Sequence, residues 1–353
     1  MSVEAETIIP VADPNAVMSV FVDHLVKDHE LSFDTTSDGA KVLQQEGFGL
    51  TFKPEPQGLY VKISGPNANI LVFFKEEIAE HVGEIDATAA ANIRWSGETA
   101  EVGGLPPNFK VLAVKQSREL FAGMQRVTLG HDDVGSLIAD GVHLRMMMPL
   151  DPTRIAVWPH MAANGAPIWP QEEDKLHARF ITLRHVRPDD GEVDIDIVRH
   201  DGGLISDWAT QATPGQTVGV MGPAGAAELK HETGLFLAAD GTGIPAVARL
   251  METASDDATG DVVVAMPPCY NAASYFPETK LRLHPIAADR FEDEIVETAT
   301  RLTAPGETAY AFFAGEFQNA QNLRRMFKQR LNLDKTTQIS AAYWRRGVPG
   351  HGS

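Results

Sequence analysis

The chain has 353 residues, of which 43% are hydrophobic and 22% charged, and its formal net charge is −18. This length exceeds what a single hydrophobic core usually supports, so it predicts more than one domain, and the composition is typical of a folded soluble protein. The negative charge disfavours nucleic acid and anionic lipid as partners, and no apolar run is long enough for a transmembrane helix.

Two features of the sequence bear on localisation. Residues 1–15 carry acidic side chains where a secretion signal would carry Lys or Arg, and they lack a long apolar core. The single cysteine, Cys269, cannot form an internal disulfide, which agrees with a reducing compartment. The sequence therefore predicts a cytoplasmic protein without membrane insertion.

Residues 1–97 mix helical and strand patterns. Their apolar periodicity predicts two helices and a pair of strands, at 16–29, 69–85, 49–54 and 58–65. The segment 96–108, SGETAEVGGLPPN, is polar and rich in Gly and Pro, so we expect a linker there. The block as a whole predicts a small α+β domain.

Residues 108–230 are dominated by short alternating strands. Expected strands lie at 109–115, 125–131, 142–149, 178–186, 192–198 and 216–223, and one helix is expected at 204–212. Strands at this density with so little helix predict a small antiparallel β-barrel.

Residues 231–353 alternate between strands and helices. Strands are expected at 234–239, 261–266, 281–287, 309–316 and 338–344, with helices at 243–254, 291–302 and 318–331. Such alternation predicts a doubly wound α/β nucleotide-binding domain with a parallel sheet.

The strand sequence ARFITLR carries candidate ligands for a cofactor phosphate. On a regular strand Arg179 and Ile181 share one face, and Thr182 and Arg184 share the other. A guanidinium can bind a phosphate through two hydrogen bonds, and a Thr hydroxyl can meet a ring nitrogen. An ordinary barrel strand explains the same residues, so this pattern alone leaves both interpretations open.

Two further stretches place a Gly-rich turn before a helix. In DIVRHDGGLISDWA a strand ends near His200, and Ser206 is expected to cap a helix whose N-terminus could bind a diphosphate. In AADGTGIPAVARLM the strand, turn and helix match the arrangement of dinucleotide-binding sheets, without the full G-x-G-x-x-G pattern. A plain Gly turn with a capped helix remains an alternative for the first stretch.

In this order the motifs resemble those of ferredoxin-reductase-like flavoproteins, and more closely those of the siderophore-interacting protein family of FAD-dependent ferric-siderophore reductases. The family patterns R-x-Y-T-x-R, V-x-H…G-x-x-S-x-W-A and G-D-E-T-A-x-P-A resemble RFITLR, VRHDGGLISDWA and ADGTGIPA. Near the C-terminus, FFAGEFQNAQNLRRMF and AAYWRRG look like A-G-E…L-R and Y-W-R-x-G. The resemblance covers residues 108–348. The preceding block is similar to a small domain of undetermined function sometimes fused to this family.

The resemblance implies FAD and NADPH or NADH as cofactors, and a ferric siderophore or other ferric chelate as substrate. Arg179 would hold an FAD phosphate, Thr182 would approach the flavin N5 region, and Glu316 would lie near the flavin and nicotinamide. The implied cofactor-binding residues are Arg179, Ile181, Thr182, Arg184, His200, Gly203, Ser206, Trp208, Asp240, Gly241, Thr242, Pro245, Glu316 and Trp344. Arg345 and Arg346 would attract the anionic chelate.

The sequence departs from the family pattern at two places. Ile181 stands where the family has a Tyr that packs on the isoalloxazine, so stacking worth about 0.5–1.5 kcal/mol is lost. That corresponds to up to about tenfold in flavin affinity. Gly241 and Gly243 stand where the family has Glu and Ala, which suits a close backbone approach to a nucleotide.

The resulting hypothesis is an NAD(P)H- and FAD-dependent ferric-siderophore reductase that releases Fe(II). The cofactors carry the electron chemistry, so no catalytic side chain and no resident metal is expected. The pairs His24 with His29 and His177 with His185 lack the spacing of a metal site. Alternatives are a siderophore- or nucleotide-binding protein with a weakened flavin site, or a general flavin reductase.

Overall fold

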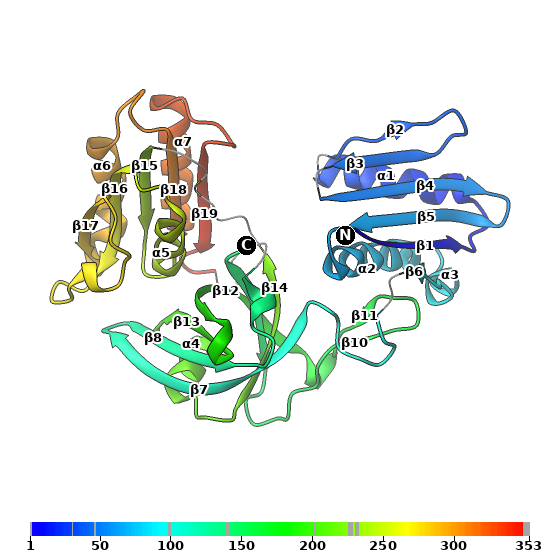
Figure 1. Cartoon of the computed structure of the whole chain (residues 1–353), viewed down its shortest axis with the longest axis horizontal. Coiled ribbons are helices and arrows are strands. Elements are labelled where there is room, and N and C mark those ends of the chain that lie inside the picture. Colours follow the sequence, from blue (N-terminus) through cyan, green and yellow to red (C-terminus); the bar gives the residue numbers. More distant parts are fainter. Residues whose placement is uncertain are drawn as a thin grey trace. The chain divides into compact units, whose positions relative to one another are not determined.

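The computed structural model describes residues 2–29, 31–45, 47–97, 100–138, 141–200, 202–224, 229 and 233–348. The chain divides into two compact units (Figure 1). The first unit comprises Met1–Lys110 and Pro149–Leu176, and the second comprises Val111–Met148 and His177–Ser353. Each unit has hydrophobic cores of its own.

The first unit contains the expected α+β domain. An antiparallel sheet has the strand order β2-β3-β4-β5-β1-β6, and helices α1 and α2 pack against it around buried Phe21, Phe52 and Leu59. The element bounds are β1 Val3–Ile9, α1 Pro14–His29, β2 Asp34–Thr35, β3 Lys41–Gln45, β4 Phe48–Glu55, β5 Gly58–Gly65, α2 Ala68–Ile85, α3 Ala87–Ala91 and β6 Ser96–Gly97. Strand β6 pairs with β1, so the first two residues of the expected linker form an edge strand.

Residues 149–176 lie in the range expected for the barrel domain but pack within the first unit. The segment holds the short strands β10 (His160–Met161) and β11 (Pro167–Ile168). The Trp95 indole donates to the Asn164 carbonyl oxygen at 2.9 Å, and the Trp169 indole donates to the Glu76 carboxylate at 2.7 Å. The first unit is therefore built from two stretches of the chain.

The second unit contains the predicted antiparallel barrel. Six strands close in the order β12-β13-β8-β7-β14-β9 around an apolar core that includes Val127, Leu144 and Leu183. The bounds are β7 Phe109–Phe121, β8 Met124–Gly130, β9 His143–Pro149, β12 Leu176–Arg187, β13 Glu192–Val198 and β14 Thr217–Ala224, with helix α4 at Leu204–Gln211 and 3-10 turns at Gly135–Leu137, Glu172–Asp174 and Pro188–Asp190.

The second unit also contains the predicted doubly wound domain, with a five-stranded parallel sheet in the order β17-β16-β15-β18-β19. Separate apolar cores cover its two faces, one including residues of α5 and the other residues of α6 and α7. The bounds are β15 Gly234–Ala239, α5 Ile244–Thr253, β16 Thr259–Met266, β17 Arg282–Ala287, α6 Ala288–Leu302, β18 Tyr310–Glu316, α7 Phe317–Arg330 and β19 Gln338–Trp344, with a 3-10 turn at Ala272–Ser274. The predicted fold class is confirmed.

The strand order reverses between β15 and β18, and ligands of open parallel sheets bind at such a point. Gly243 begins α5 there, because a Cβ at this position would lie 2.6 Å from the Ala314 carbonyl oxygen of β18. A side chain cannot fit in that space, so glycine allows the helix to start directly above the two central strands.

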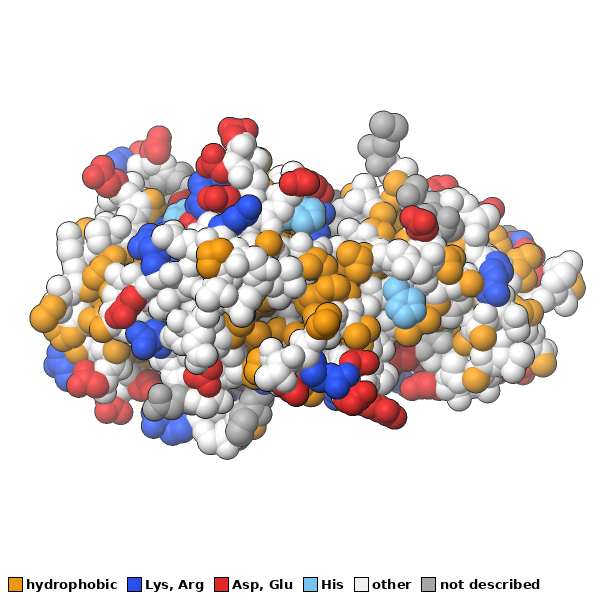
Figure 2. Space-filling view, turned by 90° about the horizontal axis from the view of Figure 1, so that it is seen from below, with side chains coloured by type: hydrophobic (Ala, Val, Ile, Leu, Met, Phe, Trp, Pro, Cys, Tyr) orange, Lys and Arg blue, Asp and Glu red, His pale blue; other side chains and the backbone are white. Residues whose placement is uncertain are grey.

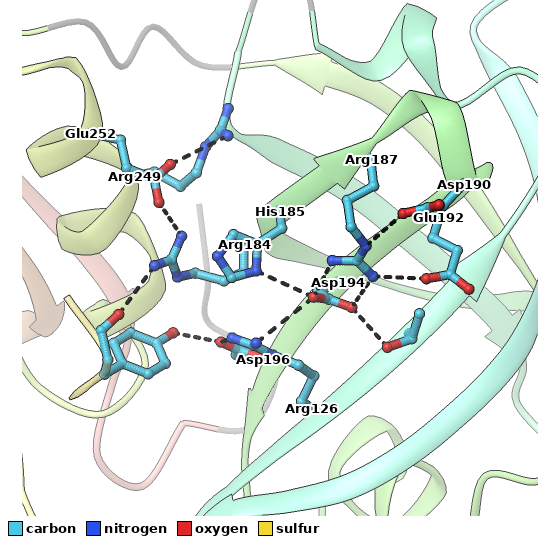
Figure 3. A network of polar contacts seen from close by, with 12 residues as sticks. Arg126, Arg184, His185, Arg187, Asp190, Glu192, Asp194, Asp196, Arg249 and Glu252 are labelled. Carbon is cyan, nitrogen blue, oxygen red and sulfur yellow. Dashed lines mark hydrogen bonds and ion pairs between the residues drawn. The ribbon is translucent and has the colours of Figure 1, made fainter. Parts of the chain in front are cut away.

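A set of buried polar contacts, here called the barrel–sheet network, holds the barrel against the parallel-sheet domain (Figure 3). Arg184 of β12 donates to Glu252 of α5 and, at 3.1 Å, to the Tyr275 carbonyl oxygen. The Tyr275 hydroxyl donates to Asp196 of β13 at 2.5 Å, and Asp196 also accepts two hydrogen bonds from Arg126 at 2.7 and 2.8 Å. Burial, followed by the charge of Asp196, raises the pKa of Tyr275 well above its usual value, so the hydroxyl remains a donor.

Asp194 of β13 ties together the neighbouring barrel strands beside this network (Figure 3). It accepts hydrogen bonds from Thr128 at 2.7 Å and from Arg187 at 2.7 and 3.0 Å, and His185 lies 3.2 Å away. Burial alone would raise the pKa of Asp194, but the contacts with His185, Arg187 and Thr128 outweigh it and hold the pKa far below its usual range. The carboxylate is therefore charged at every physiological pH.

No helix among the described residues is long and apolar enough to cross a membrane. On the face shown in Figure 2, acidic and basic side chains form small mixed groups between larger areas of uncharged and hydrophobic surface.

Replacing Arg184 tests the barrel–sheet network. We expect Arg184→Ala to lower the free energy of unfolding by about 1.5–3 kcal/mol, because a buried guanidinium loses hydrogen bonds to a charged and a neutral partner. Arg290→Ala is the control, since Arg290 forms an exposed pair with Glu294 on α6 and such pairs contribute less than about 0.5 kcal/mol. Urea denaturation followed by tryptophan fluorescence measures both. Equal effects of the two substitutions would contradict the role of the network.

Candidate functional site

Strand β12 positions Arg179 and Ile181 on the barrel. Both side chains are half-buried, and Ile181 packs against the barrel core, whereas Phe180 between them is exposed. The Arg179 guanidinium donates to the neighbouring Ala178 carbonyl oxygen at 2.7 Å and forms no ion pair with a carboxylate of the described residues. An uncompensated guanidinium in a strongly acidic chain is suited to bind an anion such as a phosphate.

Thr182 is joined to the parallel sheet through His143. The Thr182 hydroxyl lies 3.3 Å from Nδ1 of His143 on β9, and Nε2 of the same ring lies 3.1 Å from the Tyr343 hydroxyl on β19. Burial lowers the pKa of His143, so the ring is neutral and can donate from one nitrogen and accept at the other. The chain of contacts links the barrel strand to the last strand of the sheet.

The start of α4 differs from the predicted cap. Gly203 is the N-cap residue, and no side chain of the described residues caps the helix. The Ser206 hydroxyl instead accepts from the His200 backbone N–H at 2.9 Å and donates to the His200 carbonyl oxygen at 3.0 Å. The prediction that Ser206 caps α4 is therefore wrong, because the preceding turn folds back and takes its hydroxyl.

The turn before α4 brings the His200 ring over Gly203. A Cβ on Gly203 would lie 2.2 Å from Cε1 of His200, so the ring occupies the space that any side chain would need. Trp208, on the second turn of α4, packs against the barrel core. His200 and Gly203 thus lie together at the start of the helix, and Trp208 supports it from the barrel side.

On the sheet side, Asp240 at the end of β15 is the centre of a compact cluster. Its carboxylate accepts from the Thr242 backbone N–H at 2.8 Å, from the Thr242 hydroxyl at 2.5 Å and from the Trp344 indole at 2.7 Å. Burial raises the pKa of Asp240, while these hydrogen bonds act in the opposite direction. A Cβ on Gly315 would lie 2.5 Å from Asp240 Oδ2, so glycine at this position makes room for the carboxylate.

Glu316 and the two arginines occupy the neighbouring strand ends. Glu316 is buried and caps α7 by accepting from the Gln318 and Asn319 backbone N–H groups, and it also accepts from the Arg346 backbone N–H at 3.3 Å. The Arg346 side chain pairs with Glu292 at 2.5 Å. The Arg345 guanidinium lies 4.6 Å from the centroid of the Phe317 ring.

The predicted residues form one group on the barrel and one on the sheet. The groups meet through His143 with Tyr343, and through Gly241, where a Cβ would lie 3.3 Å from Val198 Cγ2 of β13. Pro245 is buried near the start of α5. Arg184 stands apart, because the barrel–sheet network occupies its guanidinium, and the structure gives it a structural contact in place of an open ligand position.

A polar hollow of about 540 Å³ lies on the barrel, away from these residues. Its lining consists of Lys115, Gln116, Arg118, Arg126, Thr128, Arg187, Glu192 and Asp194. None of them belongs to the predicted site. The barrel-strand contacts of Asp194 account for several of these side chains, so we assign the hollow no ligand.

Sequence reasoning missed His143, Tyr343, Gly315 and Tyr275. His143 lies in the expected strand 142–149 and Tyr343 in the quoted stretch AAYWRRG, but nothing in either stretch indicates that the two side chains meet. Gly315 precedes Glu316 in the quoted AGE, and its role depends on the rotamer of Asp240. A histidine within a strand rich in methionine was the one available signal.

Two family models match consecutive parts of the chain, which include most of the second unit and residues 149–176 of the first. The model described as the siderophore-interacting FAD-binding domain matches residues 113–227, and the model described as siderophore-interacting protein matches residues 233–347.

Named relatives and solved structures each match about two thirds of the chain. An NADPH-dependent ferric-chelate reductase of Escherichia coli is 29% identical over 67% of this chain and 92% of its own length. The ferric vibriobactin reductase ViuB of Vibrio cholerae is 24% identical over 67% of this chain and 90% of its own length. A siderophore utilization protein from T. fusca superposes with a TM-score of 0.59 at 26% identity, covering 70% of this chain and 97% of that structure. SipS from Aeromonas hydrophila gives 0.57 at 23% identity, covering 68% and 93%.

The lowered pKa of His143 predicts a pH effect on stability. In the unfolded chain the pKa of this histidine is about 6.5, so below that pH the unfolded chain binds a proton that the buried ring of the folded protein does not bind. The free energy of unfolding therefore decreases as the pH falls below that value. We expect the difference in unfolding temperature between the native protein and His143→Gln to narrow from pH 7.5 to 5.5. His160→Gln, at an exposed histidine, is the control. A difference in unfolding temperature that stays constant with pH would contradict the lowered pKa of His143.

Proposed function

The chain belongs to the siderophore-interacting protein family, and from this premise we propose that it is an NADPH- and FAD-dependent reductase of ferric siderophores or related ferric chelates. One NADPH supplies two electrons, which reduce two Fe(III) to two Fe(II) and leave NADP⁺ and a proton. Fe(II) is released because hard oxygen donors hold it far less tightly than Fe(III). The relatives named as ferric-chelate and ferric-vibriobactin reductases support this substrate class.

The observation that carries the proposal is the contact chain from Thr182 through His143 to Tyr343. It joins the barrel strand proposed to meet the flavin to the sheet edge proposed to receive the nicotinamide nucleotide. A bound FAD would supply the hydride and single-electron chemistry that connects NADPH to Fe(III). The protein's contribution is to orient the two cofactors, and the neutral His143 fixes the Thr182 hydroxyl in the region assigned to the flavin ring.

The residues present fit an FAD. Arg179 offers a guanidinium without a carboxylate partner among the described residues, and α4 begins without a side-chain cap, so both can serve phosphate groups. His200 and Gly203 would line the diphosphate side, and Ile181 and Thr182 would lie against the ring. Arg184 is the weakest member of the set, because Glu252 and Tyr275 already occupy it.

The end of the sheet fits the nicotinamide nucleotide. Asp240, Thr242 and Trp344 form a hydrogen-bonded cluster at the strand ends, and Gly243 lets α5 begin directly above the two central strands. Glu316 would lie beside the nicotinamide. Arg345 is the better of the two candidates for attracting an anionic chelate, since Arg346 pairs with Glu292.

This activity suits the cytoplasm, where NADPH is available and a lone cysteine such as Cys269 stays reduced. Ile181 favours a second candidate function, a siderophore- or nucleotide-binding protein that holds flavin too weakly to turn over.

Arg179→Ala tests the proposed reductase. The purified protein is mixed with FAD and NADPH under anaerobic conditions, and Fe(II) released from a ferric siderophore is trapped with a colorimetric chelator. We expect the native protein to release Fe(II) in this assay. We expect Arg179→Ala to bind FAD about 10- to 100-fold more weakly, because hydrogen bonds to a charged group contribute about 1.5–3 kcal/mol.

Arg118→Ala is the matched control, since it removes an exposed barrel arginine of the same charge. Failure of the native protein to bind FAD would overturn the proposed reductase function and leave the second candidate, a siderophore- or nucleotide-binding protein. Flavin-dependent NADPH oxidation that ignores every ferric chelate would indicate a general flavin reductase.

Ile181→Tyr tests how the site holds the flavin ring. Ile181 is half-buried, and a Tyr at this position would present an aromatic ring to the flavin, so we expect FAD to bind up to about tenfold more tightly, as stacking allows. Fluorescence titration of FAD measures the affinity. Phe180→Tyr, on the exposed opposite face, is the control and is expected to change nothing. An unchanged affinity in Ile181→Tyr would place the ring elsewhere.

A further inference from the structure

Three side chains of metal-ligand type meet between α1 and α2 of the first unit. His24 comes from α1, and Glu77 and His81 come from α2, one helical turn apart and therefore on the same side of that helix. One ligand atom from each residue lies within 4.8 Å of the other two. His24 Nε2 is 4.0 Å from Glu77 Oε2, and the centroids of the two imidazole rings are 4.3 Å apart.

The surroundings hold this cluster in place on one side and leave it accessible on the other. The buried Phe21 ring lies 5.4 Å from the His81 ring and stacks on Phe52 of the sheet. The side chains of His24 and Glu77 are 28% and 29% exposed, so an ion can reach them from solvent. The cluster therefore combines a fixed apolar wall with an open entrance.

His81 has an unsatisfied ring nitrogen. Its Nδ1 is buried and has no hydrogen-bond partner among the described residues. Buried polar atoms in folded proteins almost always have a partner, so an isolated one calls for an explanation. Coordination of a cation by this imidazole, together with the ordered water that accompanies an ion, would supply what the protein alone does not.

Two imidazoles and one carboxylate form a ligand set for a divalent first-row transition metal. This combination binds Zn²⁺ at catalytic sites and Fe²⁺ in facial triads, whereas Ca²⁺ and Mg²⁺ prefer oxygen ligands alone. Metal–ligand bonds of about 2.1 Å place donor atoms roughly 3–3.5 Å apart, and side-chain rotation can supply the difference.

We propose that His24, Glu77 and His81 bind one divalent first-row transition metal ion, Zn²⁺ or Fe²⁺, with coordination positions left open. All three ligands belong to the first unit, and all proposed cofactor residues belong to the second. The proposal therefore does not depend on the reductase activity. It gives residues 1–110, which neither family model covers, a chemical role of their own.

Metal titration of the untagged full-length protein, stripped with a chelator and kept free of FAD and NADPH, tests the proposal. The probes are Co²⁺, followed by its visible absorption, and Zn²⁺, followed by calorimetry and by displacement of Co²⁺. The native protein is expected to bind one equivalent. Glu77→Gln and His24→Gln are expected to weaken the affinity at least tenfold, as loss of a ligand costs at least as much as loss of a group that orients one.

Glu80→Gln is the matched control, because it makes the same change at an exposed position of the same helix and is expected to bind like the native protein. The variants keep His81, whose ring packs against Phe21, and circular dichroism checks that they fold. Zn²⁺ should also raise the unfolding temperature of the native protein and of Glu80→Gln, but not of His24→Gln. Absence of one-equivalent binding, or equal affinity in all four proteins, would overturn the proposal.

Discussion

The contact of Arg184 with Glu252 and Tyr275 is the constraint on which the candidate site depends. One half of the site lies on a barrel strand and the other at the ends of the parallel strands, so their geometry is only as fixed as the joint between barrel and sheet. A buried guanidinium that binds two partners across that joint has little freedom to shift, since each displacement would leave a charge without compensation. The Tyr275 hydroxyl extends the joint to Asp196 and, through it, to Arg126.

The arginines of the second unit divide into two kinds. Arg126, Arg184 and Arg187 each pair with buried or partly buried carboxylates and stabilise the barrel or its contact with the sheet. Arg179 pairs with none of the described carboxylates. In a chain of net charge −18, such a guanidinium is where an anion can bind without first breaking a salt bridge. This difference, which strand position alone cannot reveal, separates a ligand residue from a structural one on the same strand.

Local pattern was sufficient to predict the three folds but not the contacts between distant strands. Alternation and helical spacing predicted the barrel strands and the parallel sheet, because these signals lie within a few residues. The local pattern did not predict strand β1. This strand becomes an inner strand of its sheet because it pairs with β5 and β6, which lie far along the chain. Ser206 was misread for a related reason: the sequence places a hydroxyl near a helix start, and only the path of the turn decides which backbone groups it meets. His143 illustrates the same limit, since both of its partners come from other strands.

The cluster in the first unit extends this reasoning to metal ligands. The spacing of His24 and His29 in the sequence disfavours a metal site on one helix. It says nothing about a partner helix, and the pair that does have the favourable spacing, Glu77 with His81, contains only one histidine. Packing of α1 against α2 on the sheet is what adds the second imidazole. A ligand set assembled by tertiary contacts can be recognised in the structure itself. Here the indication is a buried ring nitrogen that has no hydrogen-bond partner among the described residues.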